Sequence, residues 1–362
     1  MDTAFQFTDY GEKWREHRKI FHQEMNAIGA QRLRPHQSQA SQRFLKRLLV
    51  NSDSGGASVV EQVREYVLIA GEISVSITYG FQQVSRTQHD AHLSQNAIDP
   101  LVQLLSTGGT FLVDVIPILR YLPSWATGAS FKRKAKLWNN LRQQMFDATF
   151  GEVKTDRSSG IAAPSFTSFC LNNIDPSKDI PKQEEDINHV AGSIYAAAGE
   201  TVIAVLSTCI HILLNHPEAV KRAQKEMNEV LGFGILPTFD DERVLPFTKS
   251  LILEMQRWKS PTPLGLPHVS TDDLTYKEYR IPKGSIVLGN SFVCPGRFVA
   301  EASIWVILSS LIAAFNFRRV DETGGPSHSF QTGLLRIPNE FKVRFEPRSE
   351  AMRSLISELH EG

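Results

Sequence analysis

Several common signatures are missing from this chain of 362 residues, and each absence excludes a class of protein. Cysteine occurs three times, at Cys170, Cys209 and Cys294, which is too few and too scattered for a disulfide framework or a zinc cluster. Basic and acidic residues both number 39, so the formal net charge is zero. That balance argues against a nucleic-acid partner bound by bulk charge and against a polybasic membrane tether. The motifs G-x-G-x-x-G, H-E-x-x-H and G-x-S-x-G are absent as well.

Long apolar runs are also scarce. The first residues, MDTAFQFTDYGEKWREH, contain no stretch that could act as a signal peptide. The segment from Val190 to Leu214 is long enough for a bilayer, but it carries Glu200 near its middle and His211 further on. We therefore expect this segment to be a buried helix of a large soluble domain. The chain as written is expected to lack a transmembrane anchor and to be cytoplasmic.

Helical periodicity dominates what is present. Hydrophobic residues make up 41% of the chain and charged residues 22%, a globular composition. The spacing of apolar residues predicts helices over eight segments: 11–25, 36–50, 59–79, 131–150, 184–214, 217–231, 246–258 and 296–314. The segment 151–183 is rich in serine, glycine and proline, so it is predicted to be a loop.

Strands are predicted only near the C-terminus. Residues 279–281 and 285–288 flank a Pro-Lys-Gly turn, which predicts a hairpin between them. Alternation around Val343 and Phe345 predicts one more strand. The predicted fold class is therefore mainly α with a minor β portion, in a single domain over residues 1–362.

Cys294 has a chemical context of its own. It stands in Val-Cys-Pro-Gly-Arg-Phe, directly before an apolar helix, where the helix dipole and free N–H groups favour a thiolate. Pro295 and Gly296 let the backbone turn sharply and approach a flat partner closely. A thiolate presented in this way can bind a metal or act as a nucleophile. A small buried hydrophobic residue at a helix start is the alternative, and these residues leave both open.

The predicted helix 184–214 has an unusual middle. Four small residues, 196–199, precede Glu200 and Thr201. Small residues make the helix thin, so a broad group can lie against it, and a neighbouring acid and hydroxyl can relay a proton. Close packing of the alanines on another helix, with Glu200 facing solvent, is the alternative.

Glu254 and Arg257 are three residues apart on a predicted helix and can form an ion pair. Phe247, Leu251 and Trp258 share a stripe with Glu254, which predicts that the carboxylate faces the core. A buried charge must be paired, and losing its partner costs about 3–5 kcal/mol. The pair is therefore predicted to be a structural lock rather than a catalytic group.

Trp14 and Arg18 lie four residues apart on one face of the first predicted helix. An arginine beside an indole suits an anionic group, such as a carboxylate, at the edge of a buried ligand. An arginine whose stem covers a core tryptophan is the alternative.

Four motifs, in this order, resemble the C helix, the I helix, the K helix and the haem loop of the cytochrome P-450 family: Trp14-x-x-x-Arg18, Ala197-Ala198-Gly199-Glu200-Thr201, Glu254-x-x-Arg257 and Cys294-Pro295-Gly296. The segments 114–117 and 121–125 are similar to filamentous-fungal members of secondary metabolism. The similarity runs over nearly the whole chain. It implies the mainly helical fold of that family.

The resemblance implies haem-dependent monooxygenation of an apolar small-molecule substrate. The implied cofactor is haem b (iron protoporphyrin IX), with electrons from NADPH delivered by a cytochrome P-450 reductase. Glu254 and Arg257 would lock the core behind the haem loop. Full-length members would be anchored in the endoplasmic reticulum membrane, and no nucleic acid is implied as a partner.

The resemblance also implies roles for site residues. Cys294 would be the axial ligand of the haem iron, and Gly296 would lie against the cofactor. Glu200 and Thr201 would be catalytic and would deliver protons during oxygen activation. The haem propionates would be held by three residues: Trp14, Arg18 and His268.

The chain departs from the family pattern in three places. It begins near the C helix, so the first part of the family fold is not in the chain as written. Ala198 stands where the I-helix pattern has glycine. The Phe, Gly and Arg that precede the family's cysteine are replaced by Val287, Asn290 and Phe292, which predicts an internal deletion just before Cys294. A truncated, haem-free remnant or helical scaffold without activity is the alternative function.

The missing arginine generates a first prediction. One absent propionate partner should cost about 1–3 kcal/mol of haem binding, and a short connection leaves Cys294 little choice of approach. We therefore expect the purified chain, titrated with hemin and followed by its Soret absorbance, to bind haem weakly and to turn over little substrate with a reductase. Tight stoichiometric binding with turnover would contradict this expectation.

Overall fold

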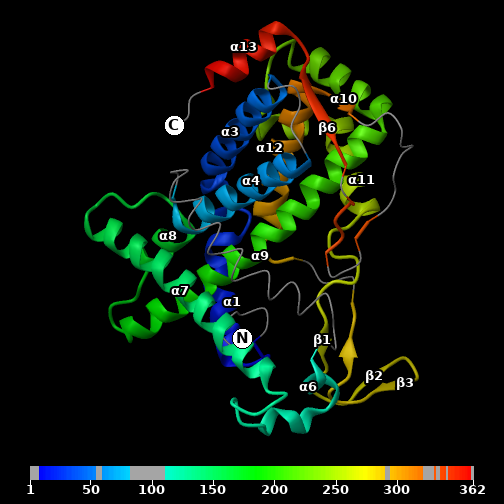
Figure 1. Ribbon diagram of the computed structural model, residues 1–362. Helices are drawn as coiled ribbons and strands as arrows, with labels where there is room; N and C mark the ends of the chain where they lie inside the picture. Colours follow the sequence, from blue (N-terminus) through cyan, green and yellow to red (C-terminus); the bar gives the residue numbers. More distant parts are fainter. Residues whose placement is uncertain are drawn as a thin grey trace. The chain divides into compact units, whose positions relative to one another are not determined.

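The structure is a computed structural model that describes residues 8–53, 59–81, 111–289, 294–320, 330–331, 335–339 and 341–359. Over these residues it is mainly helical, with short two-stranded antiparallel sheets (Figure 1), which confirms the predicted fold class. The chain forms two compact units. Unit 1 comprises Met1–Thr8, Glu16–Glu24 and Val67–Glu200; unit 2 comprises Asp9–Arg15, Met25–Tyr66 and Thr201–Gly362. The single domain expected over residues 1–362 stays a prediction.

Most predicted helices are present with similar bounds. The helices are α1 (Glu12–Met25), α2 (Gly29–Arg32), α3 (Arg34–Asp53), α4 (Val59–Tyr79), α6 (Leu112–Val115), η2 (Pro117–Tyr121), α7 (Ser130–Ser158), α8 (Phe166–Asn172), α9 (Ile180–Asn215), α10 (Pro217–Val230), η3 (Asp240–Arg243), α11 (Pro246–Trp258), α12 (Arg297–Ala314) and α13 (Glu350–Glu358). The strands are β1 (His268–Val269), β2 (Leu274–Tyr276), β3 (Tyr279–Ile281), β4 (Ile286–Val287), β5 (Phe315–Arg319) and β6 (Val343–Pro347). Helices α1, α4, α10, α11 and α12 begin and end within one residue of their predicted bounds.

The loop predicted over 151–183 is wrong. It contains the end of α7, all of α8 and the start of α9. Helix α8 begins at a capping box: Ser165 Oγ accepts the N–H of Ser168 (3.1 Å), and Ser168 Oγ accepts the N–H of Ser165 (2.8 Å). Both capping side chains are serines, so a composition typical of a loop conceals a helix start.

The predicted hairpin is also wrong in its pairing. Strand β3 pairs with β2, and β4 pairs with β1. Lys277 adopts a left-handed φ of 54° in the tight turn between β2 and β3. Gly284, at φ 82°, donates its N–H to the Ser270 carbonyl (2.9 Å) and so directs the next residues toward β1. The Pro-Lys-Gly turn is a real turn, but it joins two different sheets.

The core of unit 2 surrounds α12, which is buried along Ser303–Ala314. Polar side chains of neighbouring helices bind it near both ends. Gln37 of α3 donates its amide to Ser303 Oγ (2.8 Å), and Gln224 of α10 donates to the Ile312 carbonyl (3.1 Å). The start of α12, directly after Cys294, is therefore held by a buried scaffold.

In unit 1, α9 packs closely against α7. A Cβ atom placed on Gly192 of α9 would lie 2.4 Å from the ring of Phe146, so this contact requires glycine. Tyr195 meets the ring of Tyr79 edge-on at 5.8 Å, and Asn188 donates to the Asp147 carboxylate (2.9 Å). These contacts fix the part of α9 that precedes its small-residue stretch.

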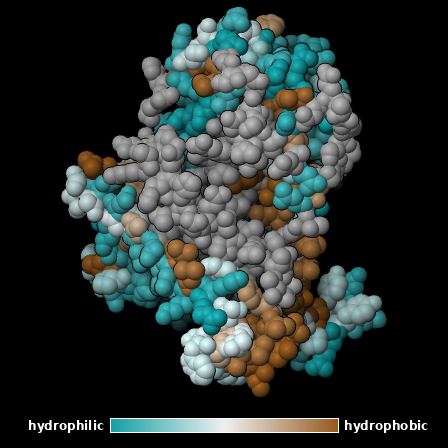
Figure 2. Space-filling model, in the orientation of Figure 1, coloured by the Kyte–Doolittle hydropathy of each residue, from teal (hydrophilic) through white to brown (hydrophobic). Residues whose placement is uncertain are grey.

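Unit 1 exposes apolar side chains around α6 and η2. Leu112 is 71% exposed, Ile118 72% and Trp125 84%. Brown hydrophobic surface is visible at the lower end of Figure 2, where Figure 1 draws α6. The segments 114–117 and 121–125, which carry the likeness to fungal family members, belong to this surface region.

Two helices of the described chain, α9 and α12, are long and apolar enough to cross a membrane by length and composition. The most apolar stretch of each is mostly buried inside the protein, 71% for α9 and 67% for α12. Core helices of large domains pass the same test of length and composition.

The start of α11 is capped by a residue of another helix. Glu226 of α10 accepts the N–H groups of Phe247 and Thr248, each at 2.8 Å, and the Thr248 hydroxyl at 2.8 Å. Proline at the first position of α11 has no N–H of its own to satisfy. One carboxylate therefore satisfies the free donors of α11 and joins it to α10.

Removing this cap should destabilise unit 2. We expect Glu226→Ala to lower the free energy of unfolding by about 1–3 kcal/mol, because two partly buried N–H groups lose a charged acceptor. The matched control is Glu229→Ala on the same helix, whose exposed carboxylate lies 3.7 Å from Lys225 and should contribute little. Urea unfolding measures both, and equal losses would show that Glu226 is no cap.

Candidate functional site

Cys294 lies in a turn directly before α12, and its thiol is exposed. The Arg297 N–H donates to the Cys294 carbonyl (3.3 Å), and the Ala300 N–H donates to the Gly296 carbonyl (3.0 Å), so Gly296 is the N-cap of α12. The cysteine thus lies beside the N-terminus of an 18-residue helix. This end of a helix carries partial positive charge. An anionic ligand atom is favoured at such a place.

The other two cysteines lie in a different environment. Cys170 and Cys209 are both buried, and burial raises the pKa of Cys209 to about 12. A thiol must lose its proton to bind a metal, so burial disfavours that role. Among the three cysteines, Cys294 alone is an exposed thiol.

On the N-terminal side of Cys294, the structure describes the chain up to Gly289. A Cβ atom on Gly265, which has a left-handed φ of 66°, would lie 3.1 Å from the Gly289 carbonyl, so two backbone segments pass close together here. Five residues further on, Cys294 can lie at most about 18 Å from this contact. Asn290 and Phe292, at which the sequence departs from the family pattern, lie outside the described residues.

The small-residue stretch of α9 has few described neighbours on one side. Ala197 is exposed, and a Cβ atom on Gly199 would meet no atom of the described residues within 4 Å. Tyr195 before the stretch and Val202 after it are buried. This exposure disfavours the alternative in which the alanines pack closely on another helix. Thr201 is half-buried, and the side chain of Glu200 lies outside the described part of the structure.

Glu254 and Arg257 form an ion pair with two hydrogen bonds of 2.6 Å. Their side chains are 57% and 72% exposed, so the prediction that Glu254 faces the core is wrong. The hydrogen bond from Arg257 lowers the pKa of Glu254 and raises the pKa of Arg257. The buried face of α11 consists of Thr248, Ile252 and Met255. Because a threonine belongs to that face, the pattern of apolar residues alone predicts the wrong buried face for α11.

The residues predicted to hold haem propionates are accessible. Trp14 and Arg18 are half-buried on α1, and His268 is exposed on β1. The ring of Tyr10 lies 5.2 Å from that of Trp14, and the Arg18 guanidinium lies 5.8 Å from the Phe21 ring. Unit 1 contains Arg18 and Glu200. Unit 2 contains the other predicted site residues: Trp14, Thr201, Glu254, Arg257, His268, Cys294 and Gly296.

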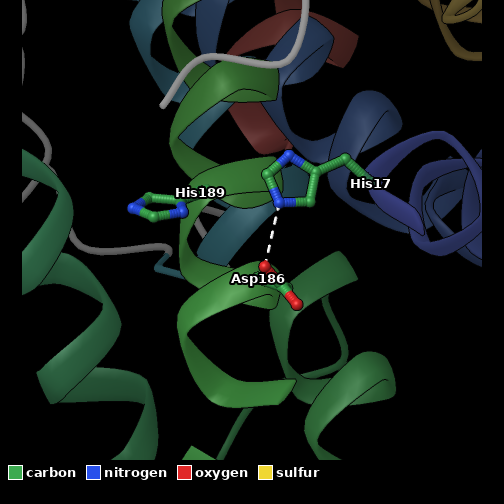
Figure 3. A group of neighbouring side chains, drawn as sticks. All are labelled: His17, Asp186 and His189. Atoms are coloured by element: carbon green, nitrogen blue, oxygen red, sulfur yellow. Dashed lines mark hydrogen bonds and ion pairs between the residues drawn. The ribbon is translucent and has the colours of Figure 1, made fainter. Parts of the chain in front are cut away.

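A second cluster, in unit 1, is not predicted by the sequence. His17 of α1 and Asp186 of α9 are buried, with His17 Nε2 3.0 Å from Asp186 Oδ1 (Figure 3). Lys182, one turn earlier on α9, places Nζ 2.6 Å from the same oxygen. His189, one turn later, is half-buried, and its ring centroid lies 5.9 Å from that of His17.

The electrostatics of this cluster centre on a carboxylate. Burial alone would raise the pKa of Asp186, but hydrogen bonds from Lys182 and His17 outweigh it and lower that pKa. The hydrogen bond to Asp186 raises the pKa of Lys182. His17 and Asp186 are 169 residues apart, so only the spacing Asp186-x-x-His189 was visible beforehand. That spacing places two metal-binding side chains on one helix face.

Comparison with known proteins gives consistent results. A family model described as cytochrome P-450 matches residues 2–293 and ends one residue before Cys294. Cytochrome P-450 monooxygenase 98 of Postia placenta is 32% identical over 98% of this chain and 76% of its own length. Tryptamine 4-monooxygenase of Psilocybe cyanescens is 28% identical over 97% of this chain and 77% of its own. A zebrafish cytochrome P-450 structure with progesterone has a TM-score of 0.75 at 18% identity, covering 96% of this chain and 86% of that one, which shows a shared fold.

The exposed ion pair on α11 generates a prediction opposite to the one from sequence. We expect Glu254→Ala to leave the urea midpoint unchanged within error, because water screens an exposed pair. The control is Ile252→Ala on the buried face of the same helix, which should lose about 2–5 kcal/mol. A comparable loss in both variants would show that Glu254 is buried in solution.

Proposed function

The chain belongs to the cytochrome P-450 family, and we propose that it oxidises an apolar small molecule, with the low turnover expected above and with Cys294 as the thiolate ligand of its haem iron. The family is one of haem monooxygenases, and the fungal relatives are named as such. The exposed thiol of Cys294 at the start of α12 is the observation that carries the ligand assignment. The family match favours an enzyme over a haem-free scaffold.

The donor chemistry of the chain fits a haem. The ligand must be a thiolate, and Cys294 offers an exposed sulfur at a helix N-terminus. Trp14, Arg18 and His268 each carry N–H donors that can bind a propionate carboxylate. No described residue lies within 4 Å of a Cβ atom placed on Gly199, which leaves room beside α9 for a planar group. These features support the proposal.

Bound haem would supply the oxygen activation that protein side chains do not provide. The chain's own residues would orient the substrate and move protons. The half-buried Thr201 hydroxyl can donate a hydrogen bond and pass on a proton, and Glu200 can resupply that proton. The Cys294 thiolate would donate electron density to the iron.

The substrate class and the electron source belong to the same proposal. We infer an apolar small molecule, oxidised with electrons from NADPH through a cytochrome P-450 reductase. One relative is named for tryptamine, a small molecule whose indole ring is largely apolar. The alignment with the Postia placenta relative spans 408 positions, more than the 362 residues of this chain. The relative therefore has residues within the aligned region that this chain lacks, as an internal deletion would produce.

The ligand assignment is tested by spectroscopy of the full chain loaded with haem. We expect the reduced, carbon-monoxide-treated chain to show the thiolate-type Soret band, and Cys294→Ala to abolish it because the ligand is lost. Cys170→Ala and Cys209→Ala are matched controls that should retain the band. Retention in Cys294→Ala, or loss in one control with intact helix content, would contradict the assignment.

A further inference from the structure

We propose that His17, Asp186 and His189 form a binding site for a divalent transition metal of the zinc type, separate from the haem. The two imidazoles and the carboxylate offer ligand atoms that all lie within 4.8 Å of one another. Two nitrogens and one oxygen suit Zn²⁺, whereas Mg²⁺ and Ca²⁺ prefer oxygen ligands alone. Three protein ligands would leave one position of a tetrahedral zinc for water.

The first two ligand atoms already have the spacing that a metal needs. Tetrahedral zinc with bonds of about 2.0–2.2 Å places neighbouring ligand atoms about 3.3 Å apart. His17 Nε2 and Asp186 Oδ1 are 3.0 Å apart, so an ion could replace the proton between them with little movement. His17 Nδ1 has no hydrogen-bond partner among the described residues, so no second bond resists a small shift of the ring.

The third ligand comes from the helix geometry of α9. His189 follows Asp186 by three residues, so the two side chains lie on the same face, one turn apart. His17 approaches from α1, as Figure 3 shows. Helical proteins build metal sites in this way, from an acid-x-x-histidine pair on one helix and a ligand on a facing helix. His189 is half-buried, and its ligand nitrogen lies within 4.8 Å of the ligand atoms of His17 and Asp186.

Lys182 provides the competing explanation and also the sharpest test. Its ammonium binds Asp186 Oδ1 at 2.6 Å, so the cluster could be a simple salt bridge. The Lys182 side chain is 49% exposed and can move into solvent. Glu16 and Glu185 lie close enough to raise the pKa of Lys182, so their carboxylates could receive it. A metal would compete with Lys182, whereas in a simple salt bridge Lys182 is the stabilising partner.

The experiment measures metal affinity in the full chain, without using haem or activity. Zn²⁺ is titrated against a chromophoric chelator in the Cys294→Ala background, which removes the exposed thiol as a competing ligand. Co²⁺ then reports tetrahedral coordination through its visible absorption. The test is independent of the proposed function, because a failed haem assay leaves the metal titration unchanged.

We expect one ion per chain. His189→Ala and Asp186→Asn should each weaken binding by roughly tenfold or more, since even outer partners of a metal site contribute that much. Lys182→Met should strengthen binding by roughly 1.5- to 5-fold, because it removes a competing ion pair. His22→Ala, which removes an exposed histidine elsewhere on α1, is the matched control and should change nothing.

Three results would overturn the proposal. The first is no saturable Zn²⁺ binding by the parent chain. The second is equal affinity in His189→Ala and His22→Ala. The third is unchanged or weaker binding in Lys182→Met, which would show that the ion does not compete with Lys182 for Asp186. Circular dichroism of each metal-free variant checks its fold, and His189→Ala, at a half-buried position, keeps the test available if Asp186→Asn unfolds.

Discussion

The burial of α12 is the constraint on which the candidate haem site depends. Twelve consecutive residues of this helix, Ser303–Ala314, are buried, so the helix cannot shift without exposing a large apolar surface. Its polar anchors come from several elements: Trp305 donates to the Thr238 carbonyl (2.9 Å), and Arg348 donates to the Ala313 carbonyl (3.0 Å). Cys294 lies just outside this fixed helix, at its exposed end. A ligand there has a rigid support.

Two ion pairs of the chain show how burial decides the importance of a charge. Glu254 and Arg257 have good hydrogen-bond geometry, but water surrounds them and screens their attraction. Asp186 has a side chain only 9% exposed and needs its partners, because an unpaired buried carboxylate is strongly destabilising. The pair in the family motif, Glu254 and Arg257, is therefore the exposed one. The buried pair, His17 and Asp186, belongs to no such motif. Motif spacing is local, whereas burial is a property of the fold.

The sequence predicted the bounds of most helices well and the pairing of strands badly. The bounds of α11 and α12 follow from apolar periodicity, helped in α11 by a proline at its first position. Cys294 stays a prediction, and it could be proposed from the sequence because the chemistry of its thiol depends on adjacent residues. The partner of β3 was not identifiable, because a turn shows where the chain reverses but not which strand it joins. The contact of His17 with Asp186 spans 169 residues, and nothing in either neighbourhood indicates the other.

Helix α1 connects the two proposed sites through consecutive residues. His17 turns to Asp186 in the buried part of unit 1, and Arg18, the next residue, is half-buried and proposed to bind a propionate. Successive helix residues point about 100° apart, so holding this turn of α1 also fixes the direction in which the Arg18 side chain leaves the helix. An ion at His17 would cross-link α1 to α9 without touching Arg18. The proposed metal cluster would thus steady the turn of α1 that carries a proposed propionate ligand.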